Sequence, residues 1–423
     1  MLKKTLLFLE KKTRTDVRYF VKGGFWIGLE NVSAMAASLI SGIALANIFD
    51  KADYGTYKFI FSLIGTLMIF TIRGLGTAIV QAVAKSDNNA LDKGVAYQIR
   101  WGFIYVLACF IVASYYLMKD SLVIGISLLI LGIFTPLITA FRLYRSYLAG
   151  KKDFKQSAIY VSVEELTTAI LTVAALLIFN NVIFLIAVFA FVEAIQSFLF
   201  YLATKKKYQS KPLTSVSDEG FKNYARHLTI VEIFNVIARQ LDSIILFGMK
   251  GPETLALYAI AQTFPNNIYT FLKSLSGTFL PKLSEKNSAE VSRIFYRRLF
   301  QTFIIGAAVG IVYALIASTL FQIIFPKYPD AVIYSRMLAI DMALGLSAGF
   351  IGAVFFSQKL IRGIYTSTIL GTIVRLILYI TLGLTMGIAG MVTAYIISRI
   401  INIIINIFIW EIEKSRLLGS NHQ

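Results

Sequence analysis

Apolar stretches long enough to cross a lipid bilayer recur along the whole chain and constrain its fold more than any other feature. The sequence is 57% hydrophobic and 15% charged, whereas a soluble domain carries about 25% charged residues. A helix needs about 20 residues to cross the hydrocarbon core. Because the apolar stretches are continuous and do not alternate with polar residues, we predict helices and an all-α integral membrane protein.

Short polar segments separate the apolar stretches and predict twelve transmembrane helices. The predicted spans are residues 24–48, 59–80, 101–118, 122–141, 157–179, 182–203, 224–248, 254–279, 299–325, 331–357, 363–385 and 388–410. Pro136 and Pro265 fall inside two of these spans, where we expect them to kink the helix.

Lysine and arginine are distributed unequally between the two sides of this layout. Thirty of the 41 Lys and Arg residues fall on one side, five fall on the opposite side, and six lie within spans. Because positively charged loops stay in the cytoplasm, we predict that both termini are cytoplasmic. The same bias accounts for the net charge of +18, so we expect no nucleic acid partner.

A long polar insert after the sixth span divides the chain into two halves. An offset of 201 residues relates the halves weakly, for example by aligning Tyr57 with Tyr258; the alternative is coincidence among apolar residues. With six spans each, the halves would be related by a pseudo-two-fold axis along the membrane normal. We predict an N-terminal six-helix bundle at 1–204, a cytoplasmic linker at 205–222 and a C-terminal six-helix bundle at 223–423.

Basic residues inside the predicted spans are the main functional signal. A charge at mid-bilayer costs about 2.5–3.5 kcal/mol on the insertion scale, so each one needs pairing, packing or a water-filled cavity. Guanidinium groups bind phosphate oxygens through two hydrogen bonds, and an ammonium adds a point charge. We predict that five of these residues bind an anionic substrate: Arg73, Arg239, Lys273, Arg375 and Arg399.

Structural ion pairs are the alternative role for these basic residues. Asp242 lies three residues after Arg239, on the same face of a helix. Asp341 and Arg375 are both expected at mid-depth in neighbouring spans, which makes them a second candidate pair. The sixth basic residue, Arg336, is expected near the outer surface, where its side chain can extend to water.

Acidic and amide groups inside the spans are candidates for lining a cavity or binding a coupling ion. Glu30 and Asn31 lie in the first span, and Asp242 and Asp341 lie in later spans. A carboxylate in such a position can bind a proton or Na⁺, or it can balance a basic residue such as Arg73. The sequence does not rank these roles, so the coupling ion stays open.

The sequence contains no catalytic or metal-binding motif. Its single cysteine, Cys109, and its two histidines, His227 and His422, form no metal-ligand pattern. The outward loops at 180–181 and 250–253 are too short for an extracytoplasmic catalytic domain. We therefore expect a protein that is not an enzyme and has no cofactor, and we disfavour a membrane polysaccharide polymerase.

Two short motifs carry a resemblance to a known family. The stretch Asp53-Tyr54-Gly55-Thr56-Tyr57 is followed by Arg73-Gly74-Leu75-Gly76-Thr77-Ala78. Together they resemble the first two helices of the Wzx-type polysaccharide-repeat-unit flippases. These belong to the multidrug/oligosaccharidyl-lipid/polysaccharide (MOP) exporter superfamily. The resemblance implies two six-helix bundles in a V around a central cavity, lined mainly by helices 1, 2, 7 and 8.

The resemblance also implies a function. We expect a flippase that moves an undecaprenyl-pyrophosphate-linked oligosaccharide repeat unit across the bacterial inner membrane by alternating access, for O-antigen or capsule synthesis. The implied partners are this substrate, membrane lipids and polysaccharide polymerase machinery. A multidrug/cation antiporter of the same superfamily is the alternative. An antiporter of that kind would be expected to have a cavity lined mainly by acidic residues, whereas this chain places basic residues there. A major-facilitator transporter is disfavoured because its basic loop signature is missing from residues 85–100.

Overall fold

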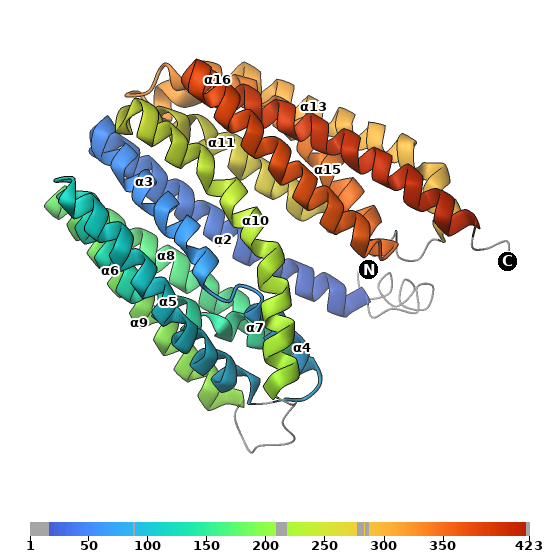
Figure 1. Ribbon diagram of the computed structural model, residues 1–423, viewed down its shortest axis with the longest axis horizontal. Coiled ribbons are helices and arrows are strands. Elements are labelled where there is room, and N and C mark those ends of the chain that lie inside the picture. Colours follow the sequence, from blue (N-terminus) through green and yellow to red (C-terminus); the bar gives the residue numbers. More distant parts are fainter. Residues whose placement is uncertain (1–16, 88, 209–217, 277–282, 284–286, 420–423) are drawn as a thin grey trace, which may run out of the picture. The chain divides into compact units, whose positions relative to one another are not determined.

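The computed structural model describes residues 17–87, 89–208, 218–276, 283 and 287–419, and these residues form helices and turns without a β-strand. Figure 1 shows the helices in chain order. The main helices are α2 (Val17–Ile48), α3 (Lys51–Leu67), α4 (Leu75–Ala84), α5 (Ala90–Met118), α6 (Leu122–Phe141), α7 (Leu143–Gly150), α8 (Phe154–Phe179) and α9 (Val182–Tyr208). They continue with α10 (Asp218–Lys250), α11 (Pro252–Ser276), α13 (Ser288–Ile324), α14 (Ala331–Leu338), α15 (Ile340–Ser357) and α16 (Ile361–Gly419).

The helices confirm an all-α, multi-pass membrane protein. In the described residues, eight helices are long and apolar enough to cross a membrane, or nine if a bent pair counts as one span. α10 and α11 are not among them, but they are helical over the predicted spans 224–248 and 254–276. Residues 277–279 of the eighth predicted span lie outside the described residues.

The long helix α16 is two helices that meet at Gly387. This glycine has φ 60° and ψ −128°, a conformation that side chains with a Cβ rarely adopt. It falls between the predicted spans 363–385 and 388–410, so the sequence placed this boundary correctly. Pro136 and Pro265 both lie inside helices that continue past them.

The second predicted span is broken, which the sequence did not predict. The short 3₁₀ turn Met68–Phe70 follows α3, and α4 begins only at Leu75. The two parts are bent by 56°. The backbone N–H of Gly74, in this break, donates to the hydroxyl of Thr229 at 3.0 Å. A side chain from a distant helix thus satisfies a backbone group that the broken helix cannot pair.

The chain forms two compact units, which differ from the contiguous halves predicted with a linker at 205–222. The first unit contains residues 1–44 and 67–230, and the second contains 45–66 and 231–423. Two segments do not follow the predicted halves. Leu45–Thr66 belongs to the second unit, and residues 218–230 of α10 belong to the first. In the first unit, Phe221 and Ala225 of α10 are buried in the cluster built from α4, α5 and α7.

A buried carboxylate organises the first unit. In this unit α6 packs against α5 and α9, and α9 also packs against α8 (Figure 1). Glu164 of α8 is fully buried. It accepts hydrogen bonds from Arg142 Nε at 2.9 Å, Tyr144 Oη at 2.7 Å, Arg145 Nη2 at 2.7 Å and Ser197 Oγ at 3.0 Å. These partners compensate the cost of burying the charge.

The segment Leu45–Thr66 joins the second unit through close contacts with α10, α11 and α13. The rings of Phe59 and Phe247 stack with their centroids 3.7 Å apart. Asn47 Nδ2 donates to the carbonyl of Ile324 at 2.8 Å, at the C-terminal end of α13. Such contacts, far apart in sequence, explain why this segment does not stay with the rest of the N-terminal half.

Candidate functional site

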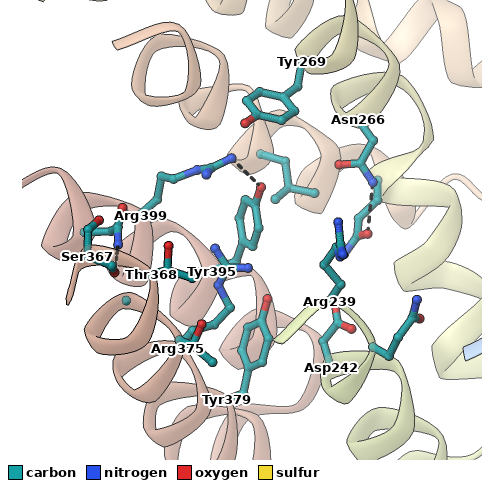
Figure 2. Close-up of a pocket in the computed structure, with 16 residues that line it drawn as sticks. Arg239, Asp242, Asn266, Tyr269, Ser367, Thr368, Arg375, Tyr379, Tyr395 and Arg399 are labelled. Carbon is teal, nitrogen blue, oxygen red and sulfur yellow. Dashed lines mark hydrogen bonds between the residues drawn. The ribbon is translucent and has the colours of Figure 1, made fainter. Parts of the chain in front are cut away.

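A polar pocket of about 540 Å³ lies within the second unit, between α10, α11 and α16 (Figure 2). Its charged lining residues are Arg239, Asp242, Arg375 and Arg399. Neutral polar side chains complete much of the wall, including Gln262, Asn266, Ser367, Thr368, Thr372 and Asn402. A pocket with three guanidinium groups and one carboxylate suits an anionic ligand that also offers hydrogen-bonding groups.

Arg399 is held by an ion pair with Asp341. Its Nε lies 2.8 Å from Asp341 Oδ1, and its Nη2 lies 3.4 Å from Oδ2. Asp341 stands in the first turn of α15, where the helix dipole favours a negative charge. Tyr395 also donates to Asp341 Oδ2, at 2.9 Å. The candidate pairing of Asp341 with Arg375 was therefore wrong, because Arg399 occupies both carboxylate oxygens.

Arg375 makes no hydrogen bond to any residue that the structure describes, and its Nε is buried without an acceptor. Its guanidinium carbon lies 5.6 Å from the centroid of the Tyr395 ring, within range of a cation–π interaction. Figure 2 shows the side chain directed into the pocket between Tyr395 and Tyr379.

Arg239 and Asp242 do not pair with each other. Arg239 Nη2 lies 3.5 Å from Glu232 Oε2, which is two helical turns away on the same face of α10. Asp242 instead accepts a hydrogen bond from Tyr258 Oη at 2.8 Å and one from the backbone N–H of Ser243 at 2.7 Å. The candidate pair Arg239–Asp242 was therefore wrong, because the buried Asp242 is directed toward α11 and Arg239 is exposed.

Among the described side chains, the other residues predicted from the sequence, Arg73, Glu30, Asn31 and Asp341, do not line this pocket. Arg73, Glu30 and Asn31 belong to the first unit, where Glu30 accepts a hydrogen bond from Ser157 Oγ at 3.3 Å. Arg73 lies in the break before α4. The side chain of Lys273 lies outside the described residues.

Arg336 is bound to α13. It donates to the carbonyl of Ala314 at 3.0 Å and to Ser318 Oγ at 2.9 Å, and it does not line the pocket.

Sequence reasoning missed the neutral polar and aromatic part of the pocket. Tyr269, Tyr379 and Tyr395 line it beside the arginines. The missed signal is a polar stripe in an apolar helix: Thr368, Thr372, Arg375 and Tyr379 recur at intervals of three and four residues along α16, so they share one face. No group of three or more His, Cys, Asp or Glu residues that could hold a metal occurs in the described part of the chain.

The chain also matches a known protein family. The profile of the family described as "Polysaccharide biosynthesis protein" matches residues 20–287. The chain belongs to this family. No curated protein sequence matched the chain.

Solved structures of MOP exporters share the fold of this polysaccharide biosynthesis protein. One is an inward-facing multidrug resistance MATE family transporter of the MOP superfamily, with a TM-score of 0.71 and 14% identity over 92% of this chain and 96% of that chain. Another is the lipid II flippase MurJ in an inward closed conformation, with a TM-score of 0.70 and 15% identity over 92% of this chain and 87% of that chain. A third is a mutant of the MATE transporter VcmN from Vibrio cholerae, with a TM-score of 0.64 and 12% identity over 93% of this chain and 96% of that chain.

The family match and the shared fold confirm the resemblance and, with it, an all-α, multi-pass membrane fold. Identities of 12–15% are too low to carry a substrate from those proteins to this one. The family match and the shared fold show a multi-pass membrane protein of the polysaccharide biosynthesis family.

Proposed function

We propose that this protein is a flippase for a lipid-pyrophosphate-linked oligosaccharide, carried by an undecaprenyl chain, in the bacterial inner membrane. Its product would feed the synthesis of a surface polysaccharide such as O-antigen or capsule, with a polymerase as the next partner. Membership of the polysaccharide biosynthesis family supports the pathway class. The shared fold with a protein described as a lipid II flippase supports a lipid-linked substrate.

The pocket in the second unit is the observation that carries this proposal. Arg239, Arg375 and Arg399 stand in predicted membrane spans around one cavity, where Asp242 is the only acidic lining residue among those that the structure describes. Such charges are costly in a membrane unless they pair or serve a ligand. A pyrophosphate offers acceptor oxygens for guanidinium groups, and the amide and hydroxyl groups of the wall can bind sugar hydroxyls.

The lining of the pocket favours this substrate over the cations of a multidrug antiporter. A lipophilic cation needs carboxylates or bare aromatic faces, whereas two of the three tyrosines in this pocket already face a guanidinium. Arg399 lies 4.9 Å from the Tyr269 ring and 5.6 Å from the Tyr395 ring. The antiporter therefore stands as the second candidate, supported by fold similarity alone.

In the proposed mechanism, the pyrophosphate and sugar occupy polar cavity surface while the polyprenyl tail stays in the lipid. Alternating access would then expose the head group first to the cytoplasm, the side on which the loop charges predict both termini, and then to the outer side. A proton or Na⁺ gradient would drive the cycle, with Glu30 as the candidate coupling group. The chain supplies binding and orientation, and no bond is broken.

Deletion and complementation in the native host test the function. Cells that lack the protein should stop making the polymer and accumulate the undecaprenyl-pyrophosphate-linked repeat unit on the cytoplasmic side. A plasmid copy should reverse both effects. Normal polymer in the deletion strain, or polymer loss without accumulation of the lipid-linked unit, would contradict the proposal.

A further inference from the structure

We propose that Arg375 is the residue of this pocket that binds the anionic group of the substrate, while Arg399, Asp341 and Tyr395 form a positioning set that holds it in place. The inference rests on the proposed function, and it divides the arginines of the pocket into two roles. It keeps Arg375 as a substrate-binding residue, as predicted from the sequence, and assigns the structural ion pair to Arg399 instead.

Arg399 already has protein partners at Nε and Nη2. Its two contacts with Asp341 leave its side chain 14% exposed and that of Asp341 7% exposed. Its Nη2 also donates to Tyr395 Oη at 3.3 Å, and its guanidinium lies over the Tyr269 ring. For Arg399 to bind a substrate anion through Nε and Nη2 together, it would have to give up a buried ion pair, which leaves Asp341 as an unpaired buried charge.

Arg375 has the opposite balance of donors and acceptors. It is half-buried, and its Nε lacks an acceptor among the described residues. An unpaired buried donor is costly, and most such groups in native proteins bind a protein group, water or a ligand. A phosphate oxygen supplies the missing acceptor with the added strength of an ionic hydrogen bond. Arg375 therefore brings to the pocket a guanidinium that is ready to bind an anion.

Tyr395 connects the two arginines. Its hydroxyl is fixed by Asp341 and Arg399, and the guanidinium carbons of both Arg375 and Arg399 lie 5.6 Å from its ring centroid. The ring attracts Arg375 without offering it a hydrogen-bond acceptor. The ion pair thus acts on Arg375 through Tyr395, orienting its side chain while leaving its N–H groups for a ligand.

The surroundings of Arg375 match a phosphorylated sugar. Thr368, Thr372 and Tyr379 lie on the same face of α16 and line the same pocket, so hydroxyl groups flank the guanidinium on both sides. Asp242 is within electrostatic range of Arg375, but it accepts hydrogen bonds from Tyr258 and Ser243. The carboxylate can therefore balance the charge of Arg375 without blocking its donors.

Direct binding to the purified full-length protein tests the assignment. The probe is farnesyl pyrophosphate, with farnesol as the uncharged control. We expect Arg375→Gln to weaken binding of the pyrophosphate by about tenfold to a hundredfold, the loss expected for a charge-assisted contact, and to leave farnesol binding unchanged. Arg375→Lys should recover part of the affinity. Arg336→Gln is the matched control, because Arg336 is a membrane-embedded arginine outside the pocket.

The positioning set needs a separate comparison. Arg399→Gln alone should lower thermal stability, because it leaves Asp341 unpaired. The double variant Asp341→Asn/Arg399→Gln should recover stability and bind within about threefold of the wild type, because its two amide side chains can still hydrogen-bond to the Tyr395 hydroxyl and hold the ring beside Arg375. If the double variant loses as much affinity as Arg375→Gln, Arg399 binds the anion directly and the division of roles is wrong. Unchanged binding by both folded Arg375 variants also overturns the inference, while the proposed function stands. Failure of the wild type to bind the pyrophosphate contradicts the proposed function itself.

Discussion

Arg399 and Asp341 form a two-contact ion pair across the second unit, with Nε 2.8 Å from Oδ1 and Nη2 3.4 Å from Oδ2. The pair joins the second half of α16 to the first turn of α15. It occupies Arg399 and leaves Arg375 as a pocket guanidinium whose Nε has no acceptor in the described part of the chain. One ion pair thus determines which of the two α16 arginines is available to a ligand.

Glu164 should contribute strongly to the stability of the first unit. It is fully buried and pairs with both Arg142 and Arg145. Its loss would leave Arg142 with Glu193 and Arg145 with the partly exposed Glu165. Glu164→Gln should cost about 3–5 kcal/mol, as measured for broken buried pairs, and lower the unfolding temperature in detergent. Glu165→Gln is the matched control: its side chain is 30% exposed and lies 3.3 Å from Arg145, so its effect should be small. Equal effects of the two variants would contradict this role.

Gly55 should be required for the packing of α3 on α11. A Cβ at this position would lie 1.8 Å from the carbonyl oxygen of Pro252, so alanine forces the helices apart. Gly55→Ala should destabilise the protein by about 1–3 kcal/mol or more. Gly248→Ala meets no atom within 4 Å and should be neutral or slightly stabilising. The unfolding temperatures of the two variants test this prediction. Equal unfolding temperatures would show that the close contact between Gly55 and Pro252 is unimportant.

Asp153 should make stability depend on acidic pH. Burial raises the pKa of this carboxyl, but hydrogen bonds from Tyr208, Lys207 and a backbone N–H outweigh burial and hold the pKa below its ordinary value of 3.8. Because the folded-state pKa is depressed, the stabilisation is complete above that value and is lost as the pH falls through the folded-state pKa. Asp153 and Lys207 are partly exposed, so the effect should be modest.

The comparison of Asp153→Asn with the wild type measures this dependence. The variant should unfold at a lower temperature at neutral pH, and the difference should shrink once the pH is below 3.8. Asp120→Asn, at an exposed turn, serves as the control. A difference that is constant with pH would show that the charge of Asp153 does not stabilise the fold.

Glu30 should be needed for coupling if it carries the driving ion. Glu30→Gln should then abolish the dependence of transport on an imposed proton or Na⁺ gradient while the protein still inserts. Ser157→Ala removes the hydrogen bond to Glu30 but keeps the carboxylate, so it should retain that dependence. Normal, gradient-dependent transport by Glu30→Gln would reduce this residue to a structural partner.

The helices and the basic character of the protein could be predicted from its sequence because both follow from local composition. Runs of about 20 apolar residues require a helix in a membrane, and Gly387 marked the boundary inside α16. The break at residues 71–74 could not be predicted, because the partner that stabilises it is Thr229, 155 residues away. The placement of Leu45–Thr66 in the second unit depends on similarly distant contacts.

The ion pairs inside the pocket could not be predicted from the sequence, for a geometric reason. Arg375 and Arg399 stand on two helices that meet at Gly387, and both reach the ring of Tyr395. Depth in the membrane therefore could not decide which of them contacts Asp341. For Arg239, helical spacing permitted a pair with Asp242, but the side chain lies near Glu232 on the same face.

Flipping in reconstituted vesicles tests the central claim most directly. Proteoliposomes are prepared with an undecaprenyl-pyrophosphate-linked oligosaccharide in both leaflets, and an impermeant lectin or glycosidase reports the fraction that reaches the outer surface. We expect the wild type to make the inner-leaflet pool accessible and protein-free vesicles to leave it protected. Arg375→Gln should slow the process, and Arg336→Gln should not. A protected inner pool in wild-type vesicles that export a lipophilic cation would contradict the flippase and support the antiporter.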